Sequence, residues 1–180
     1  MGRQLHPVLL KKGYLEMKTP KQQLGFSLIE LLIVVAIIGI IAAIAIPNLL
    51  ASKRAANEGS AQSSMRTIYS CELTYQATTG LGDYGDIAAL STQTLTDSVL
   101  GSGIKSGYSF VATPSNAGIR PATFIATANP ITTSGAGQTG TRRFGVIQDG
   151  VLHGETPATA ALLGTPFLTT DLNASNALGN

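Results

Sequence analysis

The side chains that could perform chemistry are few in this sequence, and they lie far apart. The chain has 180 residues with one cysteine, Cys71, and two histidines, His6 and His153. A single cysteine can form neither an internal disulfide nor a cysteine-based zinc site. Asp83 and Asp86, in GLGDYGD, are weak candidates for calcium, because carboxylate oxygens are the ligands that calcium prefers. We therefore expect no enzyme, no catalytic residue and no cofactor, with calcium as a weak alternative.

One carboxylate has an unusual position. Glu30 lies near the start of an apolar run, KQQLGFSLIELLIVVAIIGIIAAIAIP, and no side chain from Leu31 to Ala51 is charged. That is about the length needed to cross a bilayer core of roughly 30 Å. A carboxylate inside a membrane is unfavourable by about 2.5–3.5 kcal/mol, so it indicates a function. We expect residues 26–51 to form a helix.

The charges are divided unevenly along the chain. Five basic residues and one acidic residue give residues 1–25 a charge of +4, whereas seven basic and nine acidic residues give the remainder −2. Because basic residues stay on the cytoplasmic side of a span, we expect the chain after the apolar run to face away from the cytoplasm. The acidic remainder shows no basic cluster, which argues against a nucleic-acid-binding patch.

The helical pattern continues beyond the apolar run. Apolar side chains recur every three or four residues over residues 52–79, which predicts an amphipathic helix that packs on a sheet. Gly80 is the expected stop of this helix. The apolar stripe consists of Ala61, Met65, Ile68, Cys71 and Tyr75.

Residues 80–180 are predicted to form a globular domain. A link with a short helix in DIAALSTQTLTDSVLGSG precedes an antiparallel sheet of about four strands. Two strands are GYSFVA and ATFIATA, and RFGVIQDGVLHG is typical of a hairpin with its turn at Asp149-Gly150. The small, polar residues from Thr156 to Asn180 are expected to form a coil that covers the sheet or is partly mobile. The predicted fold class is α+β, with a long amino-terminal helix packed on the sheet.

The apolar run has three possible interpretations, of which two are general membrane-targeting segments. A secretory signal peptide would be cleaved at Ala43-Ile44-Ala45, but the carboxylate and the length of the run are unfavourable for it. A permanent single-span anchor explains the length and leaves Glu30 without a partner.

The third interpretation comes from a resemblance. The stretch GFSLIELLIVVAIIGIIAAIAIP resembles the amino-terminal signature of type IV pilins and the related pseudopilins. The matching positions are Gly25, Phe26, Glu30, Gly39 and Pro47. The resemblance implies the type IV pilin fold, removal of the leader 1–25 by a prepilin peptidase, and N-methylation of Phe26 by the same enzyme. The mature chain would then leave the membrane and join a helical filament, with the apolar helices at its centre.

Within this resemblance Glu30 gains a partner. Cleavage creates an amine at Phe26, one helical turn away, and a paired arrangement is preferred because an unpaired buried charge is unfavourable. The resemblance implies that Glu30 also meets the terminus of a neighbouring subunit. Gly39 weakens the helix, and Pro47 lacks the N–H that would bond the Ala43 carbonyl. These two helix-breaking residues either let the segment between them bend or loosen on assembly, or only kink a continuous helix.

The resemblance implies a structural subunit of major-pilin type, first a single-pass precursor in the inner membrane and then part of an extracellular filament. Its partners would be the prepilin peptidase, other subunits and the assembly platform in the inner membrane. The alternatives are a pseudopilin of a type II secretion system, a DNA-binding minor pilin, which should show a basic patch, and an uncleaved, membrane-anchored binding domain. The carboxy-terminal cysteine pair of many pilins is missing, so their disulfide-bounded loop is not carried over.

A second methionine offers another start for the chain. Met17 opens MKTPKQQLG, which looks like the short basic leader of many pilins. We expect Met17 rather than Met1 to be the initiator, because long leaders in this family are often followed by a residue other than phenylalanine.

Overall fold

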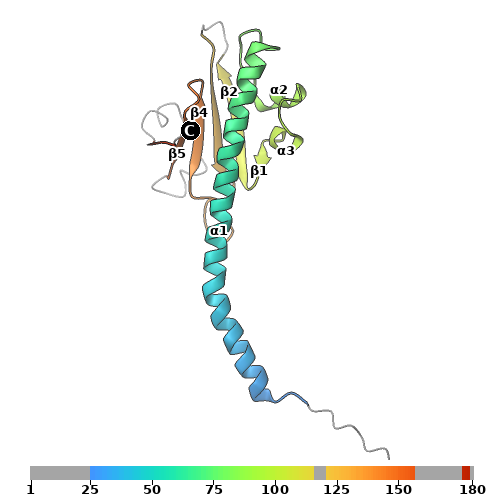
Figure 1. Cartoon of the computed structure of the whole chain (residues 1–180), viewed down its shortest axis with the longest axis vertical. Coiled ribbons are helices and arrows are strands. Elements are labelled where there is room, and N and C mark those ends of the chain that lie inside the picture. The colour runs from blue at the N-terminus through green and yellow to red at the C-terminus, as the bar shows by residue number, and fades with distance from the viewer. Residues whose placement is uncertain (1–24, 116–120, 157–175, 179–180) are drawn as a thin grey trace, which may run out of the picture. The chain divides into compact units, whose positions relative to one another are not determined.

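The computed structural model describes residues 25–115, 121–156 and 176–178 (Figure 1). The predicted leader up to residue 24, the start at Met17 and most of the predicted carboxy-terminal coil lie outside the described residues. The chain divides into two compact units, Met1–Ile40 and Ile41–Asn180.

One helix, α1 (Leu28–Ala77), contains 50 residues and includes Pro47. The helices predicted for residues 26–51 and 52–79 therefore form a single element, which is two residues shorter at each end. Its apolar half is rich in leucine, isoleucine and alanine, and its polar half contains alanine at many positions, which favours a helix throughout.

The carboxyl end of α1 is closed by a turn around Gly80. The Gly80 N–H donates to the Tyr75 carbonyl at 2.8 Å, which satisfies a carbonyl that the end of the helix leaves free. The left-handed residues are Leu81 (φ 51°) and Gly82 (φ 99°), not Gly80. Gly80 is required for another reason, because a Cβ at this position would overlap the Asp83 carbonyl oxygen and the Tyr75 ring.

The second unit contains a six-stranded antiparallel sheet with its strands in sequence order. The four longer strands lie where the sequence predicts strands. The turn of the predicted hairpin lies at Gln148-Asp149, one residue earlier than predicted, and Gly150 follows it with a positive φ of 76°. Two strands of two residues each, β1 and β6, were not predicted. They are too short for an alternating pattern, and β6 comes from the predicted coil. The strands are β1 (Ile104–Lys105), β2 (Tyr108–Ser115), β3 (Thr123–Pro130), β4 (Arg143–Ile147), β5 (Leu152–Glu155) and β6 (Asn176–Ala177).

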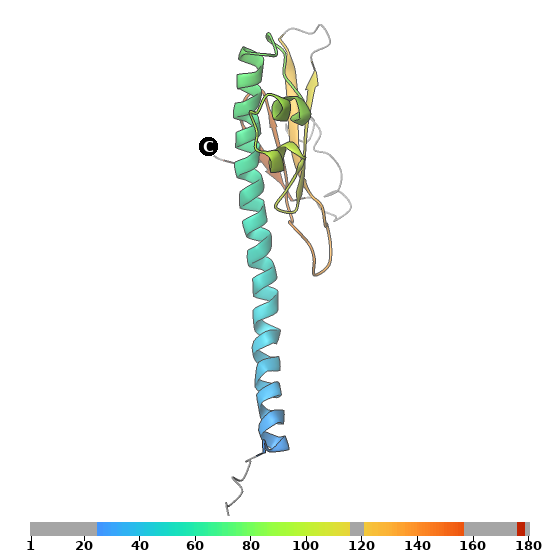
Figure 2. The same cartoon turned by 90° about the vertical axis from the view of Figure 1, so that its right-hand side faces the viewer.

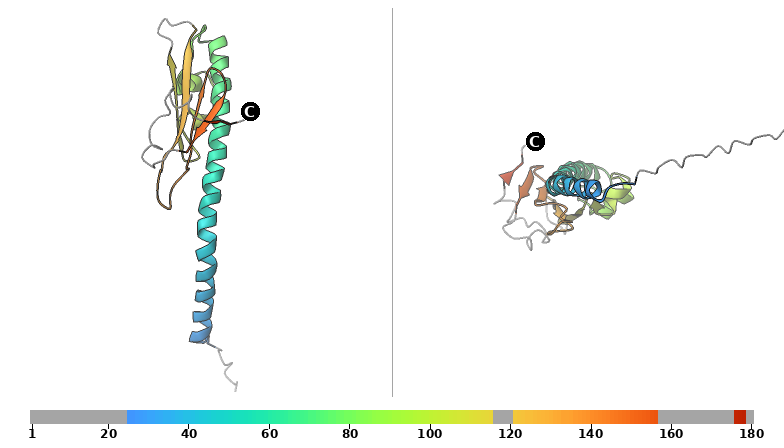
Figure 3. Two further views of the ribbon diagram at one scale, coloured as in Figure 1. Left: turned by 90° about the vertical axis from the view of Figure 1, so that its left-hand side faces the viewer. Right: turned by 90° about the horizontal axis from the view of Figure 1, so that it is seen from below.

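The amphipathic part of α1 packs on one face of this sheet, as predicted (Figures 1 and 2). Ala61, Met65 and Ile68 are fully buried, and Cys71 is buried beside them. The left view in Figure 3 shows the sheet and this part of α1 as two layers. The sheet contributes buried side chains to the core, and the residues before and within α2 and α3 contribute more. From the sheet and its edge these are Tyr108, Phe110, Ala112, Ala122, Phe124, Ala126, Ala128, Phe144, Val146 and Leu152, and from the other segment Tyr84, Ile87, Leu90 and Leu100.

Two short helices replace the single one predicted between α1 and the sheet. They are α2 (Ile87–Thr92) and α3 (Ser98–Gly101). Each begins after an aspartate whose Oδ1 accepts a backbone N–H three residues on, for Asp86 at 2.7 Å and for Asp97 at 2.8 Å. These side chains are N-caps, which stabilise a helix start by about 1 kcal/mol.

Polar contacts fasten the β3–β4 loop (residues 131–142) to α1. The Asn57 side-chain amide donates to the Thr139 carbonyl at 2.9 Å. The Glu58 carboxylate accepts from the Thr141 N–H at 2.7 Å and from the Thr141 hydroxyl at 2.8 Å. Because Asn57 and Glu58 lie a few residues beyond the apolar run, this loop meets α1 at the start of its amphipathic half.

Candidate functional site

The predicted cleavage position lies in an irregular stretch, residues 25–27, directly before α1. The Phe26 side chain is 94% exposed. A Cβ at Gly25 would meet no atom within 4 Å, so the fold itself does not require glycine there. Exposed irregular backbone of this kind is accessible to a protease.

Glu30 forms a local hydrogen bond that sequence analysis missed. The Ser27 backbone N–H donates to Glu30 Oε2 at 2.9 Å, and the Leu31 N–H donates to the Ser27 carbonyl at 3.2 Å. This is one half of a capping box, in which a glutamate at the third helical position satisfies the N–H of the residue before the helix. The carboxylate also lies at the positive end of the helix dipole. The S-x-x-E spacing of Ser27 and Glu30 is the signal that would have revealed this role.

The predicted pairing of Glu30 with the Phe26 amine stays a prediction, because the nitrogen of Phe26 is a peptide nitrogen in the uncleaved chain. The hydrogen bond does turn the carboxylate toward the residue that follows Phe26.

Gly39 and Pro47 do not interrupt α1 in this structure. A Cβ at Gly39 would meet no atom within 4 Å. Next to Pro47, the Asn48 side-chain amide donates to the Ile44 carbonyl at 3.1 Å, which adds a bond to the turn that the proline weakens. Neither residue is thus a helix break here. Bending or loosening on assembly remains a prediction.

The apolar half of α1 is exposed on all sides. All fifteen large apolar side chains from Phe26 to Leu49 are between 50% and 94% exposed. This helix is long and apolar enough to cross a membrane, and its most apolar 18 residues are 0% buried. A surface this apolar needs lipid or another protein around it.

The candidate metal ligands lie in a helix cap, a loop and a strand. Asp86 caps α2, and Asp83 is half-buried in the loop before it. His153 lies in β5 opposite Gly145 and Ala177. Within the described residues, no group of three or more histidine, cysteine, aspartate or glutamate side chains could hold a metal ion. Calcium binding by Asp83 and Asp86 thus stays a prediction.

Two pairs of aromatic side chains pack in the core of the globular domain. The Tyr84 and Phe124 ring centroids lie 4.6 Å apart, and those of Tyr108 and Phe144 lie 5.9 Å apart. Cys71 is a buried free thiol, and burial raises its pKa, which makes it a poor nucleophile.

Sequence analysis also missed Glu72, a carboxylate of α1 that is 0% exposed. It follows Cys71 at the edge of the buried stripe, where a charged residue is ordinarily expected to reach solvent. Periodicity alone gives no signal for its burial.

Comparison with known proteins identifies the amino-terminal segment. Residues 20–46 match the family described as the prokaryotic N-terminal methylation motif. The chain is 45% identical over 51 residues to the type IV major pilin protein PilA of Myxococcus xanthus, which is 28% of this chain and 23% of that protein. It is 68% identical over 34 residues to the type IV wide pilus major component PilA4 of Thermus thermophilus, which is 19% of this chain and 26% of that protein.

The matched segments span about a quarter of the length of these curated relatives. No solved structure matches the chain. The matched family covers the Gly25–Phe26 junction, Glu30 and the apolar part of α1 up to residue 46. The amino-terminal segment of this chain therefore carries the N-terminal methylation motif of type IV prepilins.

Proposed function

We propose that this chain is a major-type pilin, the non-enzymatic structural subunit of a type IV pilus. One observation carries the proposal. Residues 28–46 of the methylation motif lie on the apolar half of α1, where all the large apolar side chains are exposed, and the amphipathic continuation of this helix packs on an antiparallel sheet.

The exposed apolar surface of α1 is consistent with a precursor that lies in a membrane and with a later polymer. In the inner membrane, lipid tails would surround the apolar side chains of α1. In a filament, the same side chains of neighbouring subunits would surround one another and keep the surface from water. The folded domain faces solvent in both states, and its core is complete without the apolar residues.

The exposed Gly25–Phe26 junction supports processing by a prepilin peptidase, followed by methylation of the Phe26 amine. Glu30 would then pair with this amine. Further partners would be other copies of the chain, in a helical polymer, and the assembly platform of the inner membrane.

A pseudopilin of a type II secretion system is the second candidate, because it would share the same amino-terminal motif. The two relatives reported above are both named as major pilus components, which favours the pilin. Pseudopilin function predicts loss of secretion in a deletion strain, whereas pilin function predicts loss of surface filaments.

The proposal is tested by the intact mass of the subunit in filaments sheared from the cell surface. We expect a chain that begins at Phe26 and carries one added methyl group. Filaments that lack this chain, or a chain that retains residues before Phe26, would contradict the proposal.

A further inference from the structure

Glu72 is a fully buried carboxylate with only part of its hydrogen bonding satisfied. Its Oε2 accepts the Gly85 N–H at 3.0 Å. Its Oε1 is buried and has no hydrogen-bond partner among the described residues. A buried charge with an unsatisfied oxygen is strongly unfavourable, whereas the neutral acid loses much less on leaving water.

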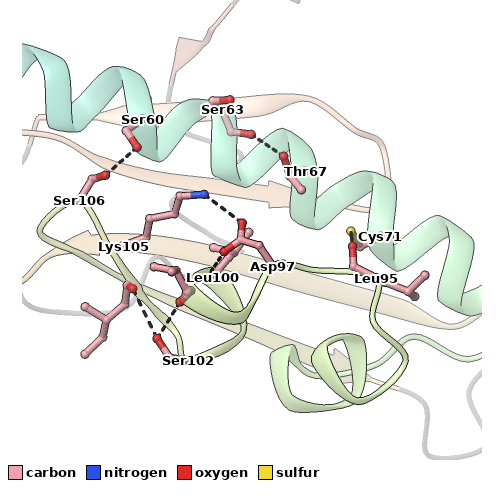
Figure 4. A network of polar contacts seen from close by, with 12 residues as sticks. Ser60, Ser63, Thr67, Cys71, Leu95, Asp97, Leu100, Ser102, Lys105 and Ser106 are labelled. Atoms are coloured by element: carbon pink, nitrogen blue, oxygen red, sulfur yellow. Dashed lines mark hydrogen bonds and ion pairs between the residues drawn. The ribbon is translucent and has the colours of Figure 1, made fainter.

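Glu72 and its neighbour Cys71 hold both ends of one segment. Gly85 directly precedes the N-cap of α2, and Leu95 lies three residues beyond its end. The Cys71 thiol donates to the Leu95 carbonyl at 2.9 Å, a contact visible in Figure 4. Two adjacent residues of α1 therefore bind the backbone on either side of α2.

The charges around Glu72 oppose its ionisation. The pKa of Glu72 is raised from 4.5 to about 7, and burial is the largest cause; the Asp86 carboxylate contributes in the same direction, whereas the Gly85 hydrogen bond acts against the shift. Cys71 on the same helix and Tyr84 in the loop also interact with Glu72 electrostatically. From the sheet, the aromatic neighbour of Tyr84 is Phe124, which does not titrate. None of these groups carries a positive charge that would stabilise the carboxylate.

We propose that Glu72 is a protonation-dependent clasp that holds the backbone before α2 against α1. In its neutral form the carboxyl stays buried, and the Gly85 contact is closed. When it ionises, the carboxylate is drawn toward water, and the segment from Leu81 to Leu95 opens more often.

The size of the effect follows from proton linkage. The buried state binds a proton with a pKa of about 7, whereas an opened, solvated state has the ordinary value of 4.5. Opening therefore becomes more favourable as pH rises between these values, and the effect levels off above the higher one. Between pH 6 and pH 8 the linkage relation gives an increase of about tenfold in the opening equilibrium.

The test is hydrogen exchange of the Gly85 amide in the full-length chain in detergent, corrected for the intrinsic pH dependence of exchange. We expect protection to fall about tenfold from pH 6 to pH 8 in the natural protein and to stay constant in Glu72→Gln. The matched control is Glu58→Gln, because Glu58 is a half-exposed carboxylate of the same helix that also accepts a backbone N–H. This variant should retain the tenfold fall. A constant protection in the natural protein, or an equal fall in Glu72→Gln, would overturn the proposal.

A second measurement keeps the proposal testable if Glu72→Gln does not fold. The carboxyl carbon of Glu72 in the natural protein is followed by NMR as the pH changes. A midpoint near pH 7 supports the clasp, and a midpoint near the ordinary 4.5 overturns it.

Discussion

Two glutamates of α1 differ in their exposure to solvent. Glu30 is exposed and bonds the N–H of Ser27 at the start of α1. Glu72 is buried at 0% exposure near the other end. Both accept a backbone N–H, and burial disfavours the charge of Glu72. The same side chain thus serves as a helix cap in one place and a titratable contact in another.

Two substitutions distinguish the hydrogen bond that Glu30 accepts at the helix start from the effect of its negative charge. Glu30→Leu removes both, whereas Glu30→Gln keeps an oxygen that can accept the Ser27 N–H and removes only the charge. If Glu30 pairs with the Phe26 amine, we expect both variants to be inserted and cleaved but to yield few filaments. The measurement is subunit mass in the membrane and filament yield after shearing. Wild-type yield from Glu30→Gln would show that capping alone is needed.

Gly25 gives a second residue-scale prediction. Because a Cβ at Gly25 meets no atom within 4 Å, Gly25→Val should leave the fold intact and act only at the peptidase. We expect uncleaved precursor to accumulate in the membrane, measured as intact mass. The control is Gly39→Ala, whose site is equally open but lies away from the junction, and it should be cleaved normally. Mature subunit from Gly25→Val would contradict the cleavage site.

The precursor trapped by Gly25→Val also reports the start of translation. A mass that begins at Met17 agrees with the expected initiator, and a mass that begins at Met1 would contradict it.

At the scale of elements, the β3–β4 loop depends on a close approach at Gly140. A Cβ there would overlap the Tyr108 hydroxyl, which donates to the Arg142 carbonyl at 2.8 Å. The loop is fastened to α1 through Thr139 and Thr141 on either side of this glycine. Gly140 therefore lets one loop touch both the sheet and the helix.

Gly140→Ala should destabilise the folded domain by about 1–3 kcal/mol, because the buried Tyr108 ring must shift to admit a methyl group. The measurement is the free energy of unfolding in denaturant. Gly137→Ala is the control on the same loop, since its Cβ would lie 3.9 Å from the nearest atom, the Thr132 Cγ2, in ordinary contact. Equal stabilities of the two variants would show that the loop adapts freely.

At the scale of the whole molecule, the buried core and the apolar surface come from different parts of the chain. No residue of the buried core precedes Ala61 within the described part of the chain. The exposed apolar side chains are concentrated from Phe26 to Leu49.

This division predicts the behaviour of a chain that contains residues 52–180 alone. We expect it to be soluble without detergent and to retain nearly the unfolding temperature of the full chain, because no core side chain is removed. The full-length chain should aggregate when detergent is withdrawn. Circular dichroism during heating and sedimentation measure the two properties. Loss of a cooperative transition in the shorter chain would show that the apolar half contributes to the fold of the domain.

The stability of the whole fold should also depend on pH through Glu72. Its pKa is about 7 when folded and 4.5 in the ordinary state, so the folded state holds the proton more tightly. The free energy of unfolding should therefore fall as pH rises through this window, by at most about 3 kcal/mol, and then level off. Denaturant unfolding at several pH values measures this. If the unfolding free energy of Glu72→Gln depends on pH to the same extent, other groups cause the dependence.

Local patterns in the sequence determined the regular elements. The uncharged apolar run from Leu31 to Ala51 indicates a spanning helix, and the steps of three and four from Ala61 to Cys71 indicate the face that packs. Alternation along β2 and β3 and the Asp149-Gly150 turn likewise predicted the sheet. These signals suffice because helix and strand periodicity is a property of neighbouring residues.

Other features depend on the tertiary structure, because it brings together residues that are distant in the sequence. Burial of Glu72 depends on the loop at Gly85, thirteen residues away. The need for glycine at position 140 depends on Tyr108, and strand β6 exists only because β5 offers it a free edge. A short segment cannot encode such contacts by its own periodicity, since their free energy arises only when the separate elements pack against one another.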